Sequence, residues 1–414
     1  MTDRPDEAAK ANSEEEERQR IRRGIRYCLV VFLALRVGLT LVGLAGVAVL
    51  PHPSEDVARE ADIPGPVGVP GWPAEDVTPG FHNVVSSWER FDGLWFLRIA
   101  DSGYQDDDGS AVFFPLYPLV IRFVASIFGG GAELGAALLI SNLAAFGAMV
   151  VLYFLTASEF DERIARRSVV YLAVFPTSFF LLAPYSESLF LLLVLTSLWA
   201  ARRGRWELAG AAGAGASATR NLGVLLVLPL AVEAIHQFRG SRDPGGLARA
   251  LVWSALAAAG TVAYLAFWQF TTGDALAPVS QQANWQRGFS PPWATLSAGT
   301  IEAFRFLGVY PGGYHLLDWL VVVPTLPAVL WAAVRTRPAF GVYVAVSLLA
   351  PLSYVFQPRP FMSLPRFLLP LFPILWAFAV WAGRRNGVHE AIVAFSATLL
   401  GILTILFLNW YYVF

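Results

Sequence analysis

Several stretches of this chain are apolar over enough residues to cross a lipid bilayer, and this feature limits its fold more than any other. The clearest are residues 27–50, 251–270 and 391–414, and only Arg36 interrupts the first. A bilayer core requires about 20 mostly apolar residues in a helix. Only 15% of the 414 residues are charged, whereas about a quarter is usual in a soluble domain. We therefore expect an all-α polytopic membrane protein.

The first 26 residues differ in composition from the rest of the chain. They are rich in charge and poor in aromatic residues, which is typical of a disordered segment. Arginines gather just before the first apolar run, which favours a cytoplasmic tail. That run is too long for a signal-peptide core and lacks a small-x-small cleavage site, so we interpret it as a retained first span. Residues 27–414 are expected to form a single membrane domain.

The distribution of arginine predicts the orientation. Arginines occur in the connections at residues 161–167, 202–205, 239–249, 335–337 and 384–385. Because arginine accumulates in cytoplasmic loops, we expect these connections in the cytoplasm. By contrast, residues 51–110 contain twelve acidic residues and three arginines. We place residues 51–130 outside the membrane as a large first external loop, and residues 271–315 and 357–366 on the same side.

The stretch 113–128 is also apolar, but a crossing there would move every later arginine loop to the outside. We therefore predict a helix at the outer interface. About eleven spans remain, with the N-terminus inside and the C-terminus outside. They are residues 27–50, 132–156, 168–183, 185–201, 206–219, 221–236, 247–270, 316–334, 339–356, 367–382 and 391–412.

Composition argues against several functional classes. Cys28 is the single cysteine, so neither a disulfide framework nor a cysteine metal site is expected. The five histidines are scattered without metal-ligand spacing, and we predict no metal and no cofactor. No basic cluster supports nucleic-acid binding. Lys10 is the sole lysine in a chain rich in Ala, Gly and Pro, a bias typical of a GC-rich bacterial genome. We accordingly expect a bacterial plasma-membrane protein.

The end of the first external loop contains a candidate catalytic acid. Five residues there share one face of a predicted helix: Trp88, Phe91, Trp95, Phe96 and Ile99. This pattern predicts an amphipathic helix on the outer leaflet, with Asp92 at membrane height. Asp92 could accept the proton of an acceptor hydroxyl, or it could be a solvated interfacial carboxylate.

Arginine is the residue type best suited to hold a lipid phosphate. Arg220 lies between two apolar runs beside Asn221, where it could face a site or reach toward the membrane surface. Arg366 and Arg359 flank an external turn, and for Arg359 we favour simple flanking charge. Arg122 could pair with an interfacial phosphate or likewise reach outward.

Another pair of candidates begins a predicted span directly after Pro184. Tyr185 and Glu187 would lie on the outer side. Glu187 could accept a hydrogen bond from a sugar hydroxyl, or it could stabilise the N-terminus of its helix.

Four segments together resemble the GPI mannosyltransferase 2 (PIG-V) family. They read FDGLWFLRIADSGY…AVFFPLYPLVIR, FPTSFFLLAPYSESLFLLLV, ATRNLGVLL and LPRFLLPLFPILW. They are similar to the family's Trp-Asp and Gly-Tyr block, its Tyr-Ser-Glu-Ser segment, its Thr-Arg-x-x-Gly segment and its late Arg-Phe segment. Two departures are Phe91 in place of the family Trp and Gln105 after the Gly-Tyr pair, where Glu is common.

The resemblance implies a glycosyltransferase C-type fold and a metal-independent mannosyltransferase. Such enzymes use a polyprenyl-phosphate sugar and carry an acid in the first external loop, which aligns with Asp92. The implied substrate-binding residues are Arg220, Arg366, Glu187, Tyr185, Asn221, Arg122 and Tyr104. The implied reaction transfers mannose, with inversion, from polyprenyl-phosphate-mannose to a glycan or glycolipid at the outer membrane face.

Two alternatives remain from the residues alone. One is a lipid or solute transporter, and the other is a catalytically inactive relative with the same fold. An Asp92 that shares its surroundings with Arg220 or Arg366 favours the enzyme, whereas an Asp92 directed at bulk water favours the inactive relative. Membrane lipids, the donor and the acceptor are the expected partners.

Overall fold

A computed structural model describes residues 4–50, 82–129, 131–305, 307–309, 312–411 and 413. Nearly all regular structure in these residues is helical, and many large apolar side chains remain exposed on the outer surface, as a lipid-facing protein requires. Within this part of the chain, five helical segments are long and apolar enough to cross a membrane, or six if one pair bent by 43° is a single span. The all-α, multi-pass prediction is confirmed, whereas the count of eleven stays a prediction.

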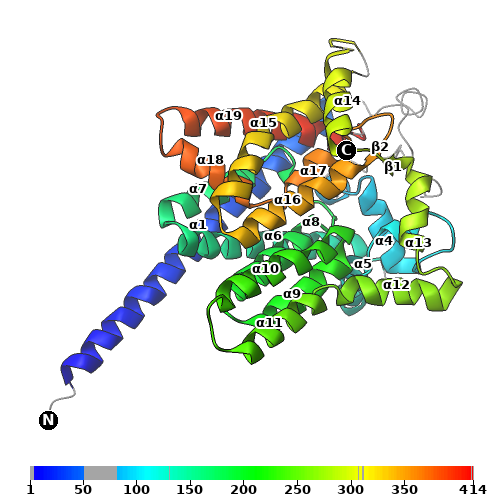
Figure 1. Ribbon diagram of the computed structural model, residues 1–414. Helices are drawn as coiled ribbons and strands as arrows, with labels where there is room; N and C mark the ends of the chain where they lie inside the picture. The colour runs from blue at the N-terminus through cyan, green and yellow to red at the C-terminus, as the bar shows by residue number, and fades with distance from the viewer. Residues whose placement is uncertain are drawn as a thin grey trace.

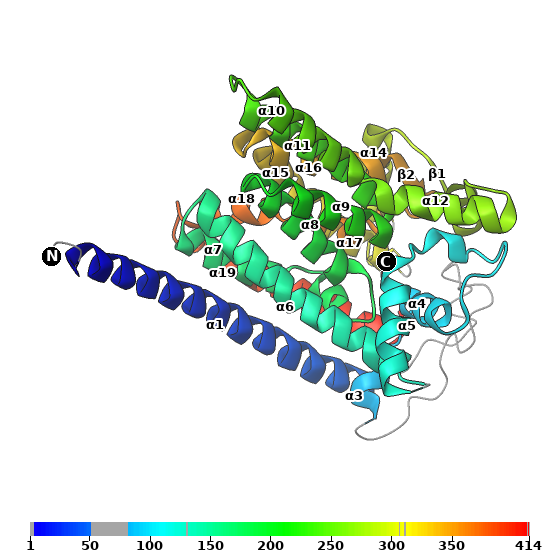
Figure 2. The ribbon, with the colours of Figure 1, turned by 90° about the horizontal axis from the view of Figure 1, so that it is seen from below.

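The first helix is longer than the sequence suggested. Helix α1 runs from Arg4 to Val49, so residues 4–26, which we predicted to be disordered, continue the first span. Glutamates and arginines among residues 14–26 are spaced to form helical i,i+4 pairs, and Arg20 Nε lies 2.9 Å from Glu162 Oε1. The helix leaves the bundle at its N-terminal end and packs along α6 (Glu133–Glu159) and α19 (Val388–Leu408) farther on (Figures 1 and 2).

The described end of the loop that we predicted to be external folds as short helices at one end of the bundle (Figure 2). These are α3 (Asn83–Ser86), α4 (Asp92–Ser102), η1 (Ser110–Val112) and α5 (Leu116–Phe128). Residues 51–81 lie outside the described part. In α5, Tyr117 faces inward and its hydroxyl lies 2.7 Å from Ser141 Oγ, whereas Leu119, Phe123 and Ile127 are exposed. An interfacial position for 113–128 stays a prediction.

The prediction that an amphipathic helix with Asp92 lies on the outer leaflet is wrong, because its apolar residues are buried in the protein. Its five apolar residues are at most 6% exposed. The apolar face of α4 therefore packs inside the protein, against α5 and α6, rather than on lipid.

The next part of the chain forms the middle of the bundle. Its elements are α7 (Glu162–Val174), η2 (Ser178–Leu181), α8 (Glu187–Arg202), α9 (Trp206–Thr219), η3 (Asn221–Leu226) and α10 (Val227–Phe238). Asp161 caps α7 by accepting a hydrogen bond from Ile164 N. The predicted span 168–183 is not one helix, because α7 stops before Pro176, which disfavours helix in the residue preceding it.

A bent pair, α11 (Pro244–Leu256) and α12 (Ala259–Thr272), leads to an irregular segment. This segment contains α13 (Ala277–Ser280), η4 (Gln281–Trp285), β1 (Arg287–Phe289) and α14 (Pro292–Arg305). Strand β1 pairs antiparallel with β2 (Tyr354–Phe356), which ends the predicted span 339–356 (Figure 1). The segment 357–366 follows directly, and Arg287 of β1 reaches it by a hydrogen bond to Ser363.

The last helices complete the bundle. They are α15 (Gly313–Arg335), α16 (Pro338–Ser353), α17 (Leu364–Leu368), α18 (Pro373–Ala382) and α19. The short helix α17 packs against α15 and α16 and brings the segment after β2 back into the protein.

Candidate functional site

A tight turn presents Asp92 at the start of α4. The carbonyl of Arg90 accepts a 3.0 Å hydrogen bond from Gly93 N, and Phe91 between them has φ 51° and ψ −121°. These angles suit the first central position of a type II′ turn, where glycine is preferred. Phe91 is held there because its ring packs 5.5 Å from the rings of both Phe407 and Trp410. Such strain costs about 1–3 kcal/mol and is typical of functional sites.

Tyr185 also fixes this turn. Its hydroxyl accepts a 3.2 Å hydrogen bond from Asp92 N and donates one of 3.1 Å to the carbonyl of Arg90. Gly93 permits this close approach, because a Cβ there would lie 3.1 Å from Pro184 Cγ. Asp92 is thereby positioned beside the start of α8.

Arg366 comes from the short helix α17 and reaches Asp92. Its Nη1 lies 2.5 Å from Asp92 Oδ2, and their side chains are 13% and 18% exposed. Thr177 anchors the helix by donating a 3.2 Å hydrogen bond to the carbonyl of Pro365. Ser363, the residue before the helix, has φ 68° and accepts a 2.8 Å hydrogen bond from Arg287 Nη2.

Glu187 joins this pair to a second arginine. The Nη1 of Arg220 donates to Glu187 Oε1 and lies 3.3 Å from Ser186 Oγ. The same Oε1 lies 3.0 Å from Arg366 Nε. Because that Nε–H makes no hydrogen bond within the described residues, the contact is electrostatic rather than directional. Glu187 is only 3% exposed.

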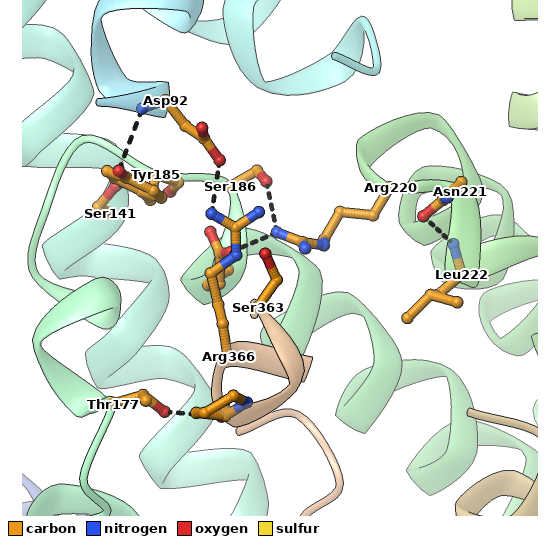
Figure 3. A network of polar contacts seen from close by, with 12 residues as sticks. Asp92, Ser141, Thr177, Tyr185, Ser186, Arg220, Asn221, Leu222, Ser363 and Arg366 are labelled. Atoms are coloured by element: carbon orange, nitrogen blue, oxygen red, sulfur yellow. Dashed lines mark hydrogen bonds and ion pairs between the residues drawn. The ribbon is translucent and has the colours of Figure 1, made fainter. Parts of the chain in front are cut away.

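Arg220 can reach Glu187 because the helical chain breaks between α9 and η3. It adopts an extended conformation at this junction, with φ −151° and ψ 148°. Gly223 is required just beyond, since a Cβ there would lie 2.4 Å from the carbonyl of Ala216. The break turns the arginine side chain toward α8 and α17 (Figure 3).

We call Asp92, Glu187, Arg220 and Arg366 the ionic cluster. Its two carboxylates and two guanidinium groups come from four separate parts of the fold and form three ion pairs, and Figure 3 shows Asp92, Arg220 and Arg366 turned toward one another. Aromatic rings surround the cations: the guanidinium carbon of Arg366 lies 5.5 Å from the ring centre of Phe180 and 5.7 Å from that of Tyr185. The formal charges of the two carboxylates and two guanidinium groups sum to zero. This pairing allows four ionised groups to stay charged in a low-dielectric site.

Three predicted site residues lie elsewhere. Asn221 is exposed, and its side chain accepts from Leu222 N. Arg122 donates to the carbonyls of Ala100 and Asp101 at the end of α4. Tyr104 donates to the carbonyl of Phe113. The structure therefore gives Arg122 and Tyr104 roles in holding the loop and places neither in the ionic cluster.

The favoured interpretation of Arg359 as flanking charge is wrong. Its Nε and Nη2 lie 2.6 and 2.8 Å from the two carboxylate oxygens of Asp318, which is 1% exposed. Nη2 also donates to the carbonyl of Val413. This bidentate pair ties the segment after β2 to α15 and to the end of the chain.

Sequence reasoning missed the polar residues that support the cluster. Ser186 contacts Arg220, Thr177 holds α17, and Ser363 precedes it. Ser186 and Thr177 both lie inside the segment FPTSFFLLAPYSESLFLLLV, so that segment was the available signal, whereas Ser363 lies just before the segment LPRFLLPLFPILW and nothing local marked it. Glu89, the neighbouring acid, lies outside the cluster, and burial raises its pKa. No group of three or more His, Cys, Asp or Glu able to hold a metal occurs in the described part.

Comparison with known proteins identifies relatives for part of the chain. Residues 53–238 match the family model described as Mannosyltransferase (PIG-V), which confirms the resemblance over that range; the segment with Arg366 lies beyond it. A stretch of 94 residues is 36% identical to GPI mannosyltransferase 2 of the yeast Yarrowia lipolytica. That stretch covers 22% of this chain and only 26% of the yeast protein.

Two solved structures show weak overall similarity. ArnT from Cupriavidus metallidurans, solved with undecaprenyl phosphate, gives a TM-score of 0.46 at 16% identity, over 93% of this chain and 76% of that one. The apo oligosaccharyltransferase of Archaeoglobus fulgidus gives 0.42 at 13% identity, over 92% and 56%.

Proposed function

We propose that this chain, whose residues 53–238 carry the mannosyltransferase (PIG-V) family match, is a membrane glycosyltransferase. It transfers mannose from polyprenyl-phosphate-mannose to a glycan or glycolipid acceptor, without a metal ion and with inversion at the anomeric carbon. It has the glycosyltransferase C-type architecture implied by its motifs. The observation that carries the proposal is the convergence of Asp92 with Arg220 and Arg366 in one buried cluster.

Asp92 acts as the general base. Its Oδ2 contacts Arg366, whereas its Oδ1 accepts no hydrogen bond from the described part of the chain. A carboxylate with an unengaged oxygen can accept the proton of an incoming hydroxyl, and positioned bases contribute about 10²–10⁴-fold to rate. The turn at Phe91 and the hydrogen bond to Tyr185 hold the carboxylate in a fixed place.

The two arginines bind the phosphate of the donor. Neither Nη2 of Arg220 nor Nη2 of Arg366 forms a hydrogen bond with the described residues. These N–H groups are therefore available for phosphate oxygens, and guanidinium–phosphate hydrogen bonds are among the strong ones. As the glycosidic bond breaks, the same cations stabilise the charge that develops on the leaving phosphate.

The reaction balances with these groups alone. The acceptor oxygen bonds to the anomeric carbon as the bond between that carbon and the phosphate oxygen breaks. The hydroxyl proton moves to Asp92, and the polyprenyl phosphate leaves with one additional negative charge. Water exclusion by the surrounding rings limits hydrolysis of the donor.

We place the ionic cluster at the outer face of a bacterial plasma membrane, with the N-terminus in the cytoplasm. Arginine-rich connections and the acidic first loop support this orientation. Membrane lipids, the lipid-linked donor and an external acceptor are then the partners.

Transfer of labelled mannose tests the function. Membranes from a deletion strain receive either the wild-type chain or Asp92→Asn, together with polyprenyl-phosphate-mannose. We expect a labelled glycan or glycolipid only with the wild type. Transport of the donor without any labelled product would support the transporter, and inactivity toward every polyprenyl-phosphate sugar would support the inactive relative.

A further inference from the structure

Arg366 lies between two carboxylates that differ in their surroundings. Asp92 is 18% exposed in its side chain and Glu187 is 3% exposed. We propose that Arg366 exchanges Asp92 for the phosphate of the incoming donor, while Glu187 stays in place as the residue that positions both arginines. This inference rests on the proposed function and assigns a role to each ion pair of the same site.

Glu187 is suited to be the fixed partner. Its Oε1 contacts Arg220 and Arg366 at the same time, so its loss would leave two buried cations close together. It is also the first residue of α8, where the positive end of the helix dipole stabilises a carboxylate. Its Oε2 is buried without a partner in the described chain, so it can accept a further hydrogen bond, such as one from a donor hydroxyl.

Asp92 is suited to be the exchangeable partner. A single contact, from Oδ2 to Arg366 Nη1, joins it to the arginines. Asp92 is the first residue of α4 and is therefore also stabilised by a helix N-terminus after the guanidinium has moved away. Its backbone stays fixed by Tyr185, so the exchange moves only side chains.

The charges during transfer fit this exchange. The resting cluster is neutral, and the phosphodiester of the donor adds one negative charge. During transfer Asp92 becomes neutral by accepting the acceptor proton, and the departing phosphate gains one negative charge. The negative charge that Asp92 loses is therefore matched by the charge gained on the phosphate that Arg366 now contacts, and the total charge of the occupied site does not change.

The exchange predicts that one variant at the site binds a polyprenyl phosphate more tightly than wild type, not more weakly. If Asp92 competes with phosphate for Arg366, Asp92→Asn removes the competitor and should bind a polyprenyl phosphate more tightly. A purely structural Asp92, which merely holds Arg366 in position, predicts weaker binding. We would measure the affinity of the full-length protein in detergent for a short-chain polyprenyl phosphate, with wild type and variant at the same ionic strength.

We expect Asp92→Asn to bind at least about tenfold more tightly than wild type. The double variant Asp92→Asn/Arg366→Gln should lose this gain, and Asp101→Asn is the matched control because Asp101 is an exposed carboxylate near the other end of α4. Unchanged or weaker binding by Asp92→Asn would overturn the exchange. A wild type that binds polyprenyl phosphate but transfers no sugar would contradict the proposed function and leave the exchange to be judged by the variants. A wild type that binds none would contradict both.

Glu187 has a separate test, which uses the kinetics of mannose transfer. Glu187→Gln should raise the donor KM more than it lowers kcat, because the arginines lose their shared anchor. Glu187→Asp should restore part of the donor affinity. If Glu187→Gln and Glu187→Asp lowered kcat equally and left the donor KM unchanged, the positioning role would be contradicted. If Glu187→Gln does not fold, the conservative Glu187→Asp and the Asp92 comparison still decide the proposal.

Discussion

Nη1 of Arg366 lies 2.5 Å from Oδ2 of Asp92, although 274 residues separate them along the chain. Asp92 and Glu187 are the first residues of α4 and α8, Arg220 lies at the break after α9, and Arg366 belongs to the five-residue helix α17. Helix ends allow charged side chains to leave the apolar bundle and converge without placing them on a lipid-facing surface. The fold therefore builds its ionic cluster where its helices stop.

Replacing Asp92 should abolish sugar transfer. Asp92→Asn preserves size and shape but cannot accept a proton, so we expect kcat to fall by about 10²–10⁴-fold. Labelled-mannose transfer in membranes measures the effect. Glu89→Gln is the control, because Glu89 lies outside the ionic cluster, and its activity should stay close to wild type. Substantial transfer by Asp92→Asn would show that another group is the base.

Replacing Arg220 should weaken donor binding. Arg220→Gln removes a charge-assisted contact, and such hydrogen bonds contribute about 1.5–3 kcal/mol. We therefore expect the donor affinity to fall by roughly 10–150-fold in a folded protein, measured by polyprenyl-phosphate binding. Asn221→Ala is the neighbouring control, since Asn221 is exposed and contacts only Leu222 N in the described chain. Normal donor affinity in Arg220→Gln would leave the arginine a structural role only.

The candidate site could be predicted largely because its residues lie in short motifs. The motifs contain all four residues of the ionic cluster, and the structure brings them together. Their pairing could not be predicted, because periodicity carries no information on which distant helix ends meet. Asn221 was selected as a motif neighbour of Arg220, but its side chain points away from the cluster (Figure 3).

The predicted position of α4 on the outer leaflet is wrong for a physical reason. An apolar helical face at 3.5-residue spacing indicates burial, but lipid and protein interior are equally apolar. Trp95 and Phe96 are therefore compatible with either location in the sequence, and only the packing of α4 against α5 and α6 decides between them. For Arg359 the sequence cannot distinguish flanking charge from a buried ion pair, because its partner Asp318 lies 41 residues away.

The orientation can be tested by cysteine labelling. Cys28 is fully buried, so an introduced cysteine can be labelled on a nearly silent background. Asp106 and Ser241 are both exposed and lie in loops predicted to be on opposite sides. Asp106→Cys should react with an impermeant thiol reagent added to intact cells, and Ser241→Cys only after permeabilisation. Reversed labelling would invert the predicted orientation and move the ionic cluster to the cytoplasmic side.

The ion pair between Asp318 and Arg359 should contribute to stability. Asp318→Asn leaves a buried guanidinium without its counter-charge, and breaking such a pair costs about 3–5 kcal/mol. We expect a lower thermal unfolding temperature in detergent. Polyprenyl-phosphate affinity, measured below that temperature, should stay near wild type because neither residue belongs to the ionic cluster. The matched surface control is Glu302→Gln, whose i,i+3 partner Arg305 is largely exposed, and it should change stability by less than about 1 kcal/mol.

The turn that presents Asp92 leads to a final prediction on Phe91. Both Phe91→Ala and Phe91→Gly lose the packing against Phe407 and Trp410, at about 3–5 kcal/mol. Alanine keeps the strain of φ 51°, whereas glycine adopts this conformation freely. Phe91→Gly should therefore be about 1 kcal/mol more stable than Phe91→Ala, although glycine is usually the less stable of the two. Thermal unfolding of both variants in the same detergent measures the difference. A more stable Phe91→Ala would mean that the backbone before Asp92 is relaxed, and the base would then lack the rigid turn that holds it against Arg366.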